Sequence, residues 1–233
     1  MSQNLCIFEY SNLGKAYLKI TCNSKEIFLD VEDITKTDLL VDKIKIEMKR
    51  LGIVSLPKVL LLLRCNETYR TTLSLPVKNY LQASHLYNKE LKTKLNKELY
   101  QTITFNYKHD LGYIFNTYYM PKSVIDSFEI IAKKLGTTID DIKPYGLYLF
   151  DLLNYKGNYV YFYIKNKACT MILVSNDNLL TSFDFEYQNS KTISNNFFLV
   201  ASKFEFEFEK LSIEQYGISS DEPIEFNIGL KQL

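Results

Sequence analysis

Two stretches of the chain share one pattern of apolar and polar positions. Residues 4–30 and 158–184 each contain three short runs of alternating apolar and polar positions, separated by polar residues that favour turns. Each stretch therefore predicts a meander of three strands. The two stretches align without a gap, which pairs Asn12 with Asn166 in the first turn of each meander. A meander that occurs twice indicates an internal duplication.

An amphipathic helix is expected behind each meander. Behind the first, apolar residues recur at helical spacing from Leu40 to Leu51, and Gly52 is suited to end the helix. Behind the second, apolar residues recur at spacings of three and four over Ile193–Tyr216. Residues 203–210 alternate as a strand would, but the wider window favours a helix.

Further strands and helices are expected between the two meanders. The predicted elements are strands over 57–65, 69–75, 100–108 and 111–119, and helices that begin at Pro76, at Pro121 and after Pro144. The polar stretch around Asp140 and Asp141 is expected to be a loop. Together these elements predict an α/β fold.

The composition excludes several classes of protein. Lys and Arg number 28 against 27 Asp and Glu, so neither nucleic acid nor an anionic membrane is indicated as a partner. The four cysteines are scattered, which is typical of buried thiols in a reducing compartment. The longest aliphatic run, Val59–Leu63, is too short to span a bilayer, and no signal-like segment opens the chain. We therefore expect a soluble, cytoplasmic protein.

Residues suited to nucleophilic or metal chemistry do not cluster in the sequence. The two histidines are His85, expected on a helix, and His109, expected in a turn, and neither has metal-ligand spacing. Phosphate loops need glycines where N–H groups converge, and magnesium-dependent enzymes also need a carboxylate. No two of the eight glycines are adjacent or separated by one residue. We expect neither a catalytic residue nor a metal site.

The first turns of the two meanders differ in the residues that phosphate binding would require. The first turn keeps an acid, a glycine and a lysine, so Glu9, Asn12 and Lys15 would contact a nucleotide if one bound. The second turn has Tyr163 and Lys165 instead. A phenol and a long ammonium side chain are poor substitutes for a magnesium-binding carboxylate and a glycine turn. The sequence therefore predicts no cofactor and no nucleotide turnover.

The middle of the chain resembles the PilM family. Residues 69–91, YRTTLSLPVKNYLQASHLYNKEL, are similar to the family's segment in which a strand ends in Leu-Pro and an insertion helix follows. Residues 118–153 are similar to the family's strand, proline-opened helix and Pro-x-x-Leu element. PilM is the actin-like cytoplasmic component of type IV pilus assembly, and the L component of type II secretion has a related cytoplasmic domain.

The resemblance covers about residues 4–187 and implies a fold. It implies an actin-like, ribonuclease-H-like α/β fold with two related lobes and an inserted strand–helix–strand subdomain. The implied divisions are residues 1–64 and 110–155 for the first lobe, 65–109 for the inserted subdomain, and 156–233 for a second, abbreviated lobe.

The chain departs from the family in its phosphate motifs. Of the family's first Asp-x-Gly motif and following lysine, only Glu9 and Lys15 match, and Tyr163-Ile164-Lys165 replaces the second motif. Residues 224–230 are expected to form the first strand of a third, glycine-rich part that the chain does not continue. In these lost motifs the chain is more similar to the L-type cytoplasmic domain than to PilM.

The lost motifs predict a non-enzymatic scaffold at the inner face of the cytoplasmic membrane. The resemblance implies two partners, a PilN-like tail of an inner-membrane protein and the assembly motor ATPase. Membrane association is expected through a partner or through a transmembrane segment beyond residue 233. One alternative is an ATP-binding actin-like ATPase or small-molecule kinase of the same fold. A filament-forming actin homologue and an α/β domain unrelated to pili are further alternatives.

The resemblance also implies a groove for an extended tail where the first lobe meets the inserted subdomain. Aromatic side chains suit such a surface because they offer a large contact area at low entropic cost. The expected partner-binding residues are Tyr107, Tyr113, Phe115 and Tyr118. The competing interpretation is that these rings cover the insertion helix.

Overall fold

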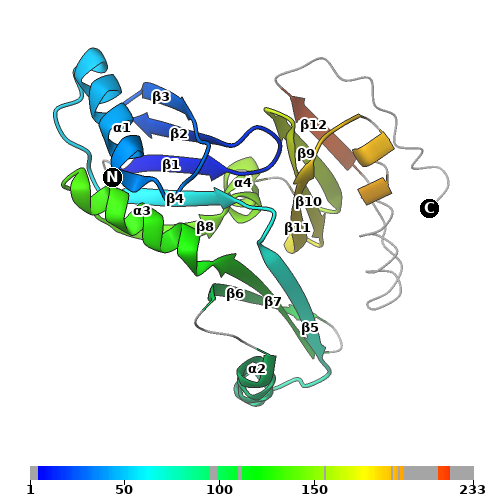
Figure 1. Ribbon diagram of the computed structural model, residues 1–233. Coiled ribbons are helices and arrows are strands. Elements are labelled where there is room, and N and C mark those ends of the chain that lie inside the picture. Colours follow the sequence, from blue (N-terminus) through cyan, green and yellow to red (C-terminus); the bar gives the residue numbers. More distant parts are fainter. Residues whose placement is uncertain are drawn as a thin grey trace. The chain divides into compact units, whose positions relative to one another are not determined.

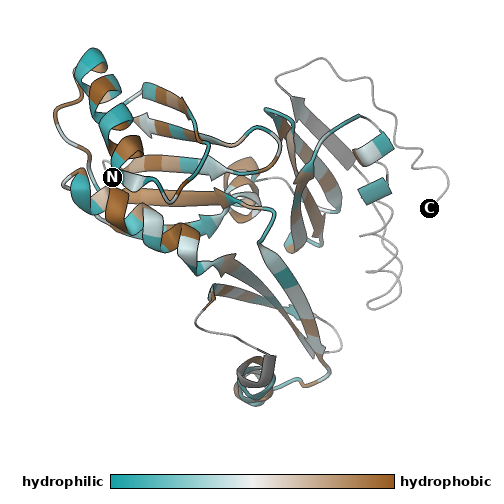
Figure 2. Ribbon diagram, in the orientation of Figure 1, coloured by the Kyte–Doolittle hydropathy of each residue, from teal (hydrophilic) through white to brown (hydrophobic). Residues whose placement is uncertain are grey.

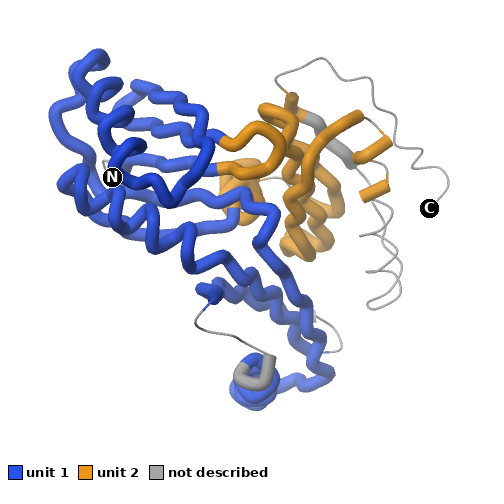
Figure 3. Tube along the Cα trace, viewed as in Figure 1, with its two compact units in different colours: residues 1–10, 17–144 blue, residues 11–16, 145–233 orange. Residues whose placement is uncertain are grey.

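The computed structural model (Figure 1) describes residues 5–94, 99–109, 112–154, 156–189, 191–193, 195–196 and 215–220. The chain divides into two compact units (Figure 3). The first unit comprises Met1–Tyr10 and Tyr17–Pro144, and the second comprises Ser11–Ala16 and Tyr145–Leu233. The hairpin turn at residues 11–16 therefore belongs to the second unit although its two strands belong to the first.

A five-stranded sheet forms the centre of the first unit. Its order is β3-β2-β1-β4-β8, with β2 and β3 antiparallel and β4 and β8 parallel. The strands are β1 (Cys6–Ser11), β2 (Tyr17–Cys22), β3 (Lys25–Asp30), β4 (Val59–Arg64) and β8 (Ile139–Pro144). The first predicted meander is thus confirmed. Strand β4 is buried throughout and is hydrophobic along nearly its whole length (Figure 2), as its apolar run predicts.

Two helices pack on one face of this sheet and complete the main core. They are α1 (Thr37–Leu51) and α3 (Lys122–Lys134), which contribute Ile44 and Phe128, both fully buried. The exposed edge strand β3 also supports α1, because Lys25 Nζ donates a hydrogen bond to the Leu51 carbonyl oxygen at 2.6 Å. A cation at this position complements the negative end of the helix dipole.

A three-stranded antiparallel sheet with one helix forms the rest of the first unit. The strands β5 (Tyr69–Leu75), β6 (Tyr100–His109) and β7 (Gly112–Pro121) lie in the order β5-β7-β6. Helix α2 (Tyr80–Lys94) packs on one face through Ala83 and Tyr87 against Phe115. Strand β7 lies in this sheet, so the inserted element extends beyond the boundary at residue 109 that the resemblance implies.

The second unit contains a sheet of related topology. Its order is β11-β10-β9-β12, and β12 runs parallel to β9. The elements are α4 (Tyr145–Leu153), β9 (Tyr159–Lys165), β10 (Ala168–Ser175), β11 (Asn178–Glu186) and β12 (Gln215–Ser220). The sequence-based boundary at residues 155 and 156 differs from this division, because α4 clusters with the second unit.

The two sheets confirm the duplicated meander but not the ungapped alignment of its turns. In each sheet the first strand of the meander lies between its second strand and a strand from later in the chain. Residues 12–16 connect β1 to β2, whereas only Asn166 and Lys167 connect β9 to β10. The second turn is therefore much tighter than the first.

Three element boundaries differ from the sequence-based expectation. Helix α2 begins at Tyr80 and not at Pro76, because the Asn79 side chain caps it by accepting a hydrogen bond from the Gln82 N–H. Residues 139–144 form β8 where a loop was expected, because pairing with β4 overrides their polar composition. The expected helix over Ile193–Tyr216 is wrong at its end, since Gln215 and Tyr216 belong to β12. Most of its length, and the expected strand at 224–230, lie outside the described residues.

Helix α4 approaches its sheet closely through a glycine. A Cβ atom on Gly146 would lie 2.2 Å from the Cβ of Ser182 on β11 and 3.3 Å from the Cγ2 of Thr170 on β10. Such distances leave no room for a methyl group. Close packing of helix on sheet therefore requires glycine at this position.

We expect Gly146→Ala to lower the free energy of unfolding by about 1–3 kcal/mol through overpacking. Helix propensity alone favours Ala over Gly by up to about 1 kcal/mol. A decrease in the free energy of unfolding would therefore indicate overpacking, whereas an increase would indicate that helix propensity dominates. The measurement is urea denaturation. The Ser182→Gly background should remove most of the loss, and a Gly146→Ala variant as stable as the parent would contradict the packing argument.

Candidate functional site

Three buried polar side chains from neighbouring strands meet in the first unit. Glu9 lies on β1, Tyr17 on β2 and Arg64 at the end of β4, and their exposed fractions are 7%, 1% and 0%. Arg64 Nη1 donates a hydrogen bond to Tyr17 Oη at 3.3 Å, and Tyr17 Oη donates to Glu9 Oε1 at 2.5 Å. The Tyr17 ring also stacks on Phe28 of β3, with the ring centres 5.2 Å apart.

Charge compensation explains this cluster. A buried guanidinium is unfavourable unless an anion and hydrogen bonds accompany it, and Glu9 supplies the anion. Burial raises the pKa of Tyr17 well above its usual value, while the positive charge of Arg64 lowers it and that of the Glu9 carboxylate raises it. The phenol therefore stays neutral and donates to the carboxylate. Glu9 is therefore buried within this cluster. It does not lie on an open surface, where a carboxylate could bind a hydrated magnesium ion.

The two hairpin turns that correspond to the phosphate motifs touch each other within the second unit. Gly14 has a left-handed φ of 62°, and a Cβ atom there would lie 3.2 Å from the Asn166 carbonyl oxygen and 3.2 Å from the Lys167 Cβ. Because even a single methyl carbon on Gly14 would be tightly packed, the two turns are in close contact at this point.

The second turn is a two-residue hairpin connection. Asn166 and Lys167 both have left-handed φ values, 50° and 61°, which is the conformation of a type I′ turn. The first turn is held differently, since the buried Ser11 side chain accepts a hydrogen bond from the Leu13 N–H at 3.2 Å. The two turns are thus distinct local structures.

The residues that replace the second phosphate motif are packed into the second unit. Ile164 is 2% exposed and lies in the core of its sheet. The ring of Tyr163 lies 5.5 Å from the ring of Tyr145 at the start of α4. An aromatic contact therefore stands where the family's motif carries an aspartate.

The three residues proposed to contact a nucleotide have different surroundings. Glu9 is buried in the first unit, whereas Asn12 and Lys15 lie in the turn that clusters with the second unit. Asn12 is half-buried and Lys15 is exposed. Sequence reasoning missed Tyr17 and Arg64. The signal for Arg64 was available, because a lone arginine ends an otherwise aliphatic run in a chain with three arginines.

The four proposed partner-binding rings are divided between the two faces of the three-stranded sheet. Tyr113 and Phe115 lie on the face that α2 covers, because alternate residues of β7 point to opposite faces. Phe115 is 2% exposed and stacks on Tyr87 of α2 with ring centres 4.5 Å apart. Phe115 thus covers the insertion helix, as the competing interpretation of the sequence expects. Tyr113 is half-buried, and its ring lies beside the ring of Tyr80.

The other two rings, Tyr107 and Tyr118, lie on the opposite face. Tyr118 is 3% exposed and stacks with Phe105 at 5.9 Å between ring centres, and Tyr107 is half-buried. Partner binding by any of the four rings remains a prediction. Sequence reasoning did not single out Tyr69, which is 56% exposed and contacts the ring of Tyr100 at 5.5 Å.

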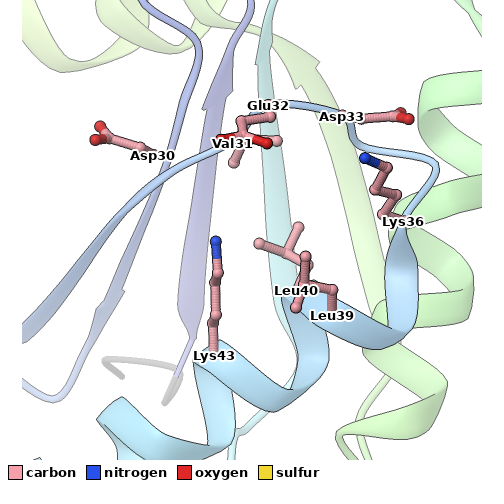
Figure 4. Close-up of a pocket in the computed structure, with 8 residues that line it drawn as sticks. All are labelled: Asp30, Val31, Glu32, Asp33, Lys36, Leu39, Leu40 and Lys43. Carbon is pink, nitrogen blue, oxygen red and sulfur yellow. The ribbon is translucent and has the colours of Figure 1, made fainter.

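A small pocket lies between the end of β3 and the start of α1 (Figure 4). Its volume is about 20 Å³, and Asp30, Asp33, Lys36 and Lys43 are among the residues that line it. The Asp33 carboxylate accepts hydrogen bonds from the N–H and hydroxyl of Thr35, which lower its pKa. The pocket is too small for a nucleotide.

The described part of the chain has neither a metal-binding cluster nor a membrane-spanning helix. Among the described residues, no group of three or more His, Cys, Asp and Glu side chains could hold a metal ion. None of the described helices has the length and apolar character needed to cross a membrane. All four cysteines are buried and none forms a disulfide, as expected from their spacing.

Comparisons with known proteins identify the fold. No protein-family model and no curated protein matches the sequence. Among solved structures, the PilM-PilN type IV pilus biogenesis complex matches with a TM-score of 0.63 and 10% identity, over 95% of this chain and 82% of that chain. The cytoplasmic domain of EpsL, an inner-membrane component of the type II secretion system of Vibrio cholerae, matches with a TM-score of 0.54 and 10% identity, over 98% and 91%.

These neighbours have the actin-like ATPase fold, and the chain shares it. The fold that the sequence resemblance implied is thereby confirmed. At 10% identity the likeness establishes the fold alone.

We expect Arg64→Met to lower the free energy of unfolding by about 3–5 kcal/mol, because it leaves the Glu9 carboxylate buried without its counter-charge. The triple variant Glu9→Leu/Tyr17→Phe/Arg64→Met should recover most of this loss, since it removes the whole cluster. Urea denaturation measures both. The exposed Arg50 gives a matched control, and Arg50→Met should change stability by less than about 0.5 kcal/mol. Equal losses for Arg64→Met and the triple variant would contradict the charge-compensation argument.

Proposed function

We propose that the chain is a non-enzymatic scaffold at the inner face of the cytoplasmic membrane, in a type IV pilus or type II secretion assembly platform. The observation that carries the proposal is the direct contact between the two hairpin turns, in which Gly14 packs on Asn166 and Lys167. In an ATPase or kinase of this fold, these turns would have to cradle phosphates between them.

Two further observations support the proposal. The acid that could order a magnesium ion, Glu9, compensates the charge of Arg64 through Tyr17. The position of the second motif's aspartate holds Tyr163, whose ring packs on Tyr145. Both groups contribute to folding energy in their present arrangement, so nucleotide binding would have to displace stable contacts. The alternative, an ATP-binding ATPase or small-molecule kinase, requires such a displacement.

The structural neighbours support the assignment to an assembly platform. One is a complex of PilM with PilN, and the other is the cytoplasmic domain of an inner-membrane secretion component. By analogy we propose an inner-membrane protein's cytoplasmic tail as the first partner and the assembly motor ATPase as the second. The three-stranded sheet is the proposed tail site, because it carries half-buried and exposed rings with an edge strand on each side.

The proposal predicts that the purified chain does not bind Mg-ATP. Titration calorimetry should give no binding heat at micromolar to submillimolar ATP, and no phosphate should be released on incubation. Low-micromolar binding, about −8 kcal/mol, would contradict the proposal and favour the ATPase alternative. Lys15→Met would then be expected to weaken binding, with Lys45→Met on the surface of α1 as its matched control.

The proposal also predicts that the chain binds the cytoplasmic tail of an inner-membrane protein encoded beside it. Tyr107→Ala and Tyr113→Ala each remove a half-buried ring from one face of the three-stranded sheet. At least one of them should weaken the tail's Kd about tenfold, since buried aromatic contacts dominate such interfaces.

The matched control for these variants is Phe183→Ala, which removes a partly exposed ring from β11 of the second unit. It should leave the affinity for the tail unchanged. Circular dichroism and the thermal midpoint must confirm that every variant is folded. Unchanged affinity in both tyrosine variants would move the tail site away from this sheet.

A further inference from the structure

The outward side of α1 and the loop after it carry aliphatic side chains that the fold does not need. Ile46, in the second half of the helix, is 65% exposed. Val54, in the loop that follows, is 97% exposed, which is the highest value among the exposed large hydrophobic residues of the described chain. Other residues of α1, such as Ile44 and Met48, form its core side. Ile46 and Val54 are therefore available to a partner.

Positive side chains accompany these two residues. Lys45, Lys49 and Arg50 are exposed in the second half of α1. Residues three and four apart are neighbours on a helix surface, so Lys49 and Arg50 lie beside Ile46. Lys25 lies close to the end of the helix, because its Nζ donates a hydrogen bond to a carbonyl oxygen there. We call this surface the basic face, and its residues are Lys25, Lys45, Ile46, Lys49, Arg50 and Val54.

The acids near this face do not balance its cations. Glu47 forms an ion pair with Arg50, with 2.7 Å between Oε2 and Nη2. Asp42 is exposed one turn nearer the start of the helix. Within the described part of the chain, no ion pair joins Lys45 or Lys49 to an acid. The whole chain has a formal net charge of +1, so this positive charge is local and the overall composition does not reveal it.

Cations beside exposed aliphatic side chains suit the surface of an anionic lipid bilayer. Interfacial helices place apolar side chains at the boundary between headgroups and acyl chains, while Lys and Arg meet the negative headgroups. The long stems of Lys and Arg can also cover apolar surface while their charges stay in water. Binding hot spots between proteins rely strongly on aromatic residues, and the basic face has none. The chemistry therefore favours lipid over a second protein.

We propose that the basic face lies against an anionic membrane surface, with Ile46 and Val54 at the level of the lipid headgroups and the lysines facing the lipid phosphates. This inference rests on the proposed function, because a scaffold at the inner face of the cytoplasmic membrane would work beside such a surface. It adds a direct contact with lipid to the contact with a partner's tail, and it uses a different part of the first unit.

The first test is co-sedimentation of the full chain with vesicles of phosphatidylcholine that contain or lack phosphatidylglycerol. The chain should sediment with the anionic vesicles alone. Lys45→Gln/Lys49→Gln should weaken binding about fivefold for each lysine removed. Lys78→Gln/Lys89→Gln removes the same charge from exposed positions before and within α2, and it should leave binding unchanged. Equal losses in the two double variants would indicate attraction by net charge alone and would overturn the inference.

The second test removes the aliphatic side chains and keeps the charges. Ile46→Gln/Val54→Gln should weaken binding to the anionic vesicles about tenfold, because these side chains would no longer leave water on binding. Leu81→Gln/Leu86→Gln, at exposed positions on α2, is the matched control and should leave binding unchanged. The thermal midpoint should not fall in either variant, since all four side chains are exposed. Unchanged binding by Ile46→Gln/Val54→Gln would exclude insertion and overturn the inference.

The third test uses tryptophan fluorescence, because the chain contains no tryptophan of its own. Val54→Trp should shift its emission to shorter wavelength on anionic vesicles and should be quenched by brominated lipid, since the indole would move from water into the interface. Soluble glycerol phosphate should cause neither change. Leu81→Trp, at a 77% exposed position on α2, is the matched control and should show neither change with vesicles. Sedimentation with vesicles while Val54→Trp still reports water would place the contact elsewhere and overturn the inference.

The outcomes separate this inference from the proposed function. A chain that binds the inner-membrane tail but no anionic vesicle overturns the membrane contact and leaves the scaffold proposal intact. A chain that binds vesicles through the basic face but binds no tail overturns the tail partner and supports the membrane contact. Weaker tail binding by Lys45→Gln/Lys49→Gln, without vesicle binding by the parent chain, would assign the basic face to a protein and overturn the lipid.

Discussion

The burial of one guanidinium constrains the sheet of the first unit. Arg64 lies at the end of an otherwise aliphatic strand and has no solvent contact, so the strands beside it must provide charge compensation and hydrogen bonds. Tyr17 on β2 accepts a hydrogen bond from Arg64 and donates one to the carboxylate of Glu9 on β1. The arrangement joins three strands by side chains as well as by backbone pairing. It also engages the Glu9 carboxylate in a hydrogen bond with Tyr17, whereas a nucleotide-binding relative would use a carboxylate at this position to hold a metal ion.

The actin-like fold is thus present with its two meanders, while the connections between strands differ from what phosphate binding demands. Phosphate loops hold their ligand with converging N–H groups and leave a gap for it. In the second unit the two turns are in close contact at Gly14, and a tyrosine pair, Tyr145 and Tyr163, packs in the same unit. Function in such a chain is expected to reside on its surfaces, and the three-stranded sheet with its aromatic rings is the surface that we propose for a partner.

Much of the fold could be predicted from local pattern, because alternation of apolar and polar residues directly reflects which face of a strand is buried. The meanders, α1, α3 and the buried run of β4 follow from it. Strand β8 could not be predicted, since its polar residues become a strand only through pairing with β4, and Lys58 forms an ion pair with Asp140 across that pairing. The candidate site was predicted in part. Glu9 was identified, but its partners Tyr17 and Arg64 come from other strands, and no local pattern links the three.

The two-residue turn at Asn166 and Lys167 restricts how such a chain could change over evolution. A type I′ turn fixes the register of β9 against β10 and contains no spare residue. Point substitutions can alter its side chains but cannot lengthen the backbone to surround a phosphate. A descendant with a nucleotide pocket here would need an insertion in this hairpin together with the retreat of the turn that holds Gly14. Because each change alone would disturb packing without yielding a pocket, single substitutions in these turns would not produce a nucleotide site.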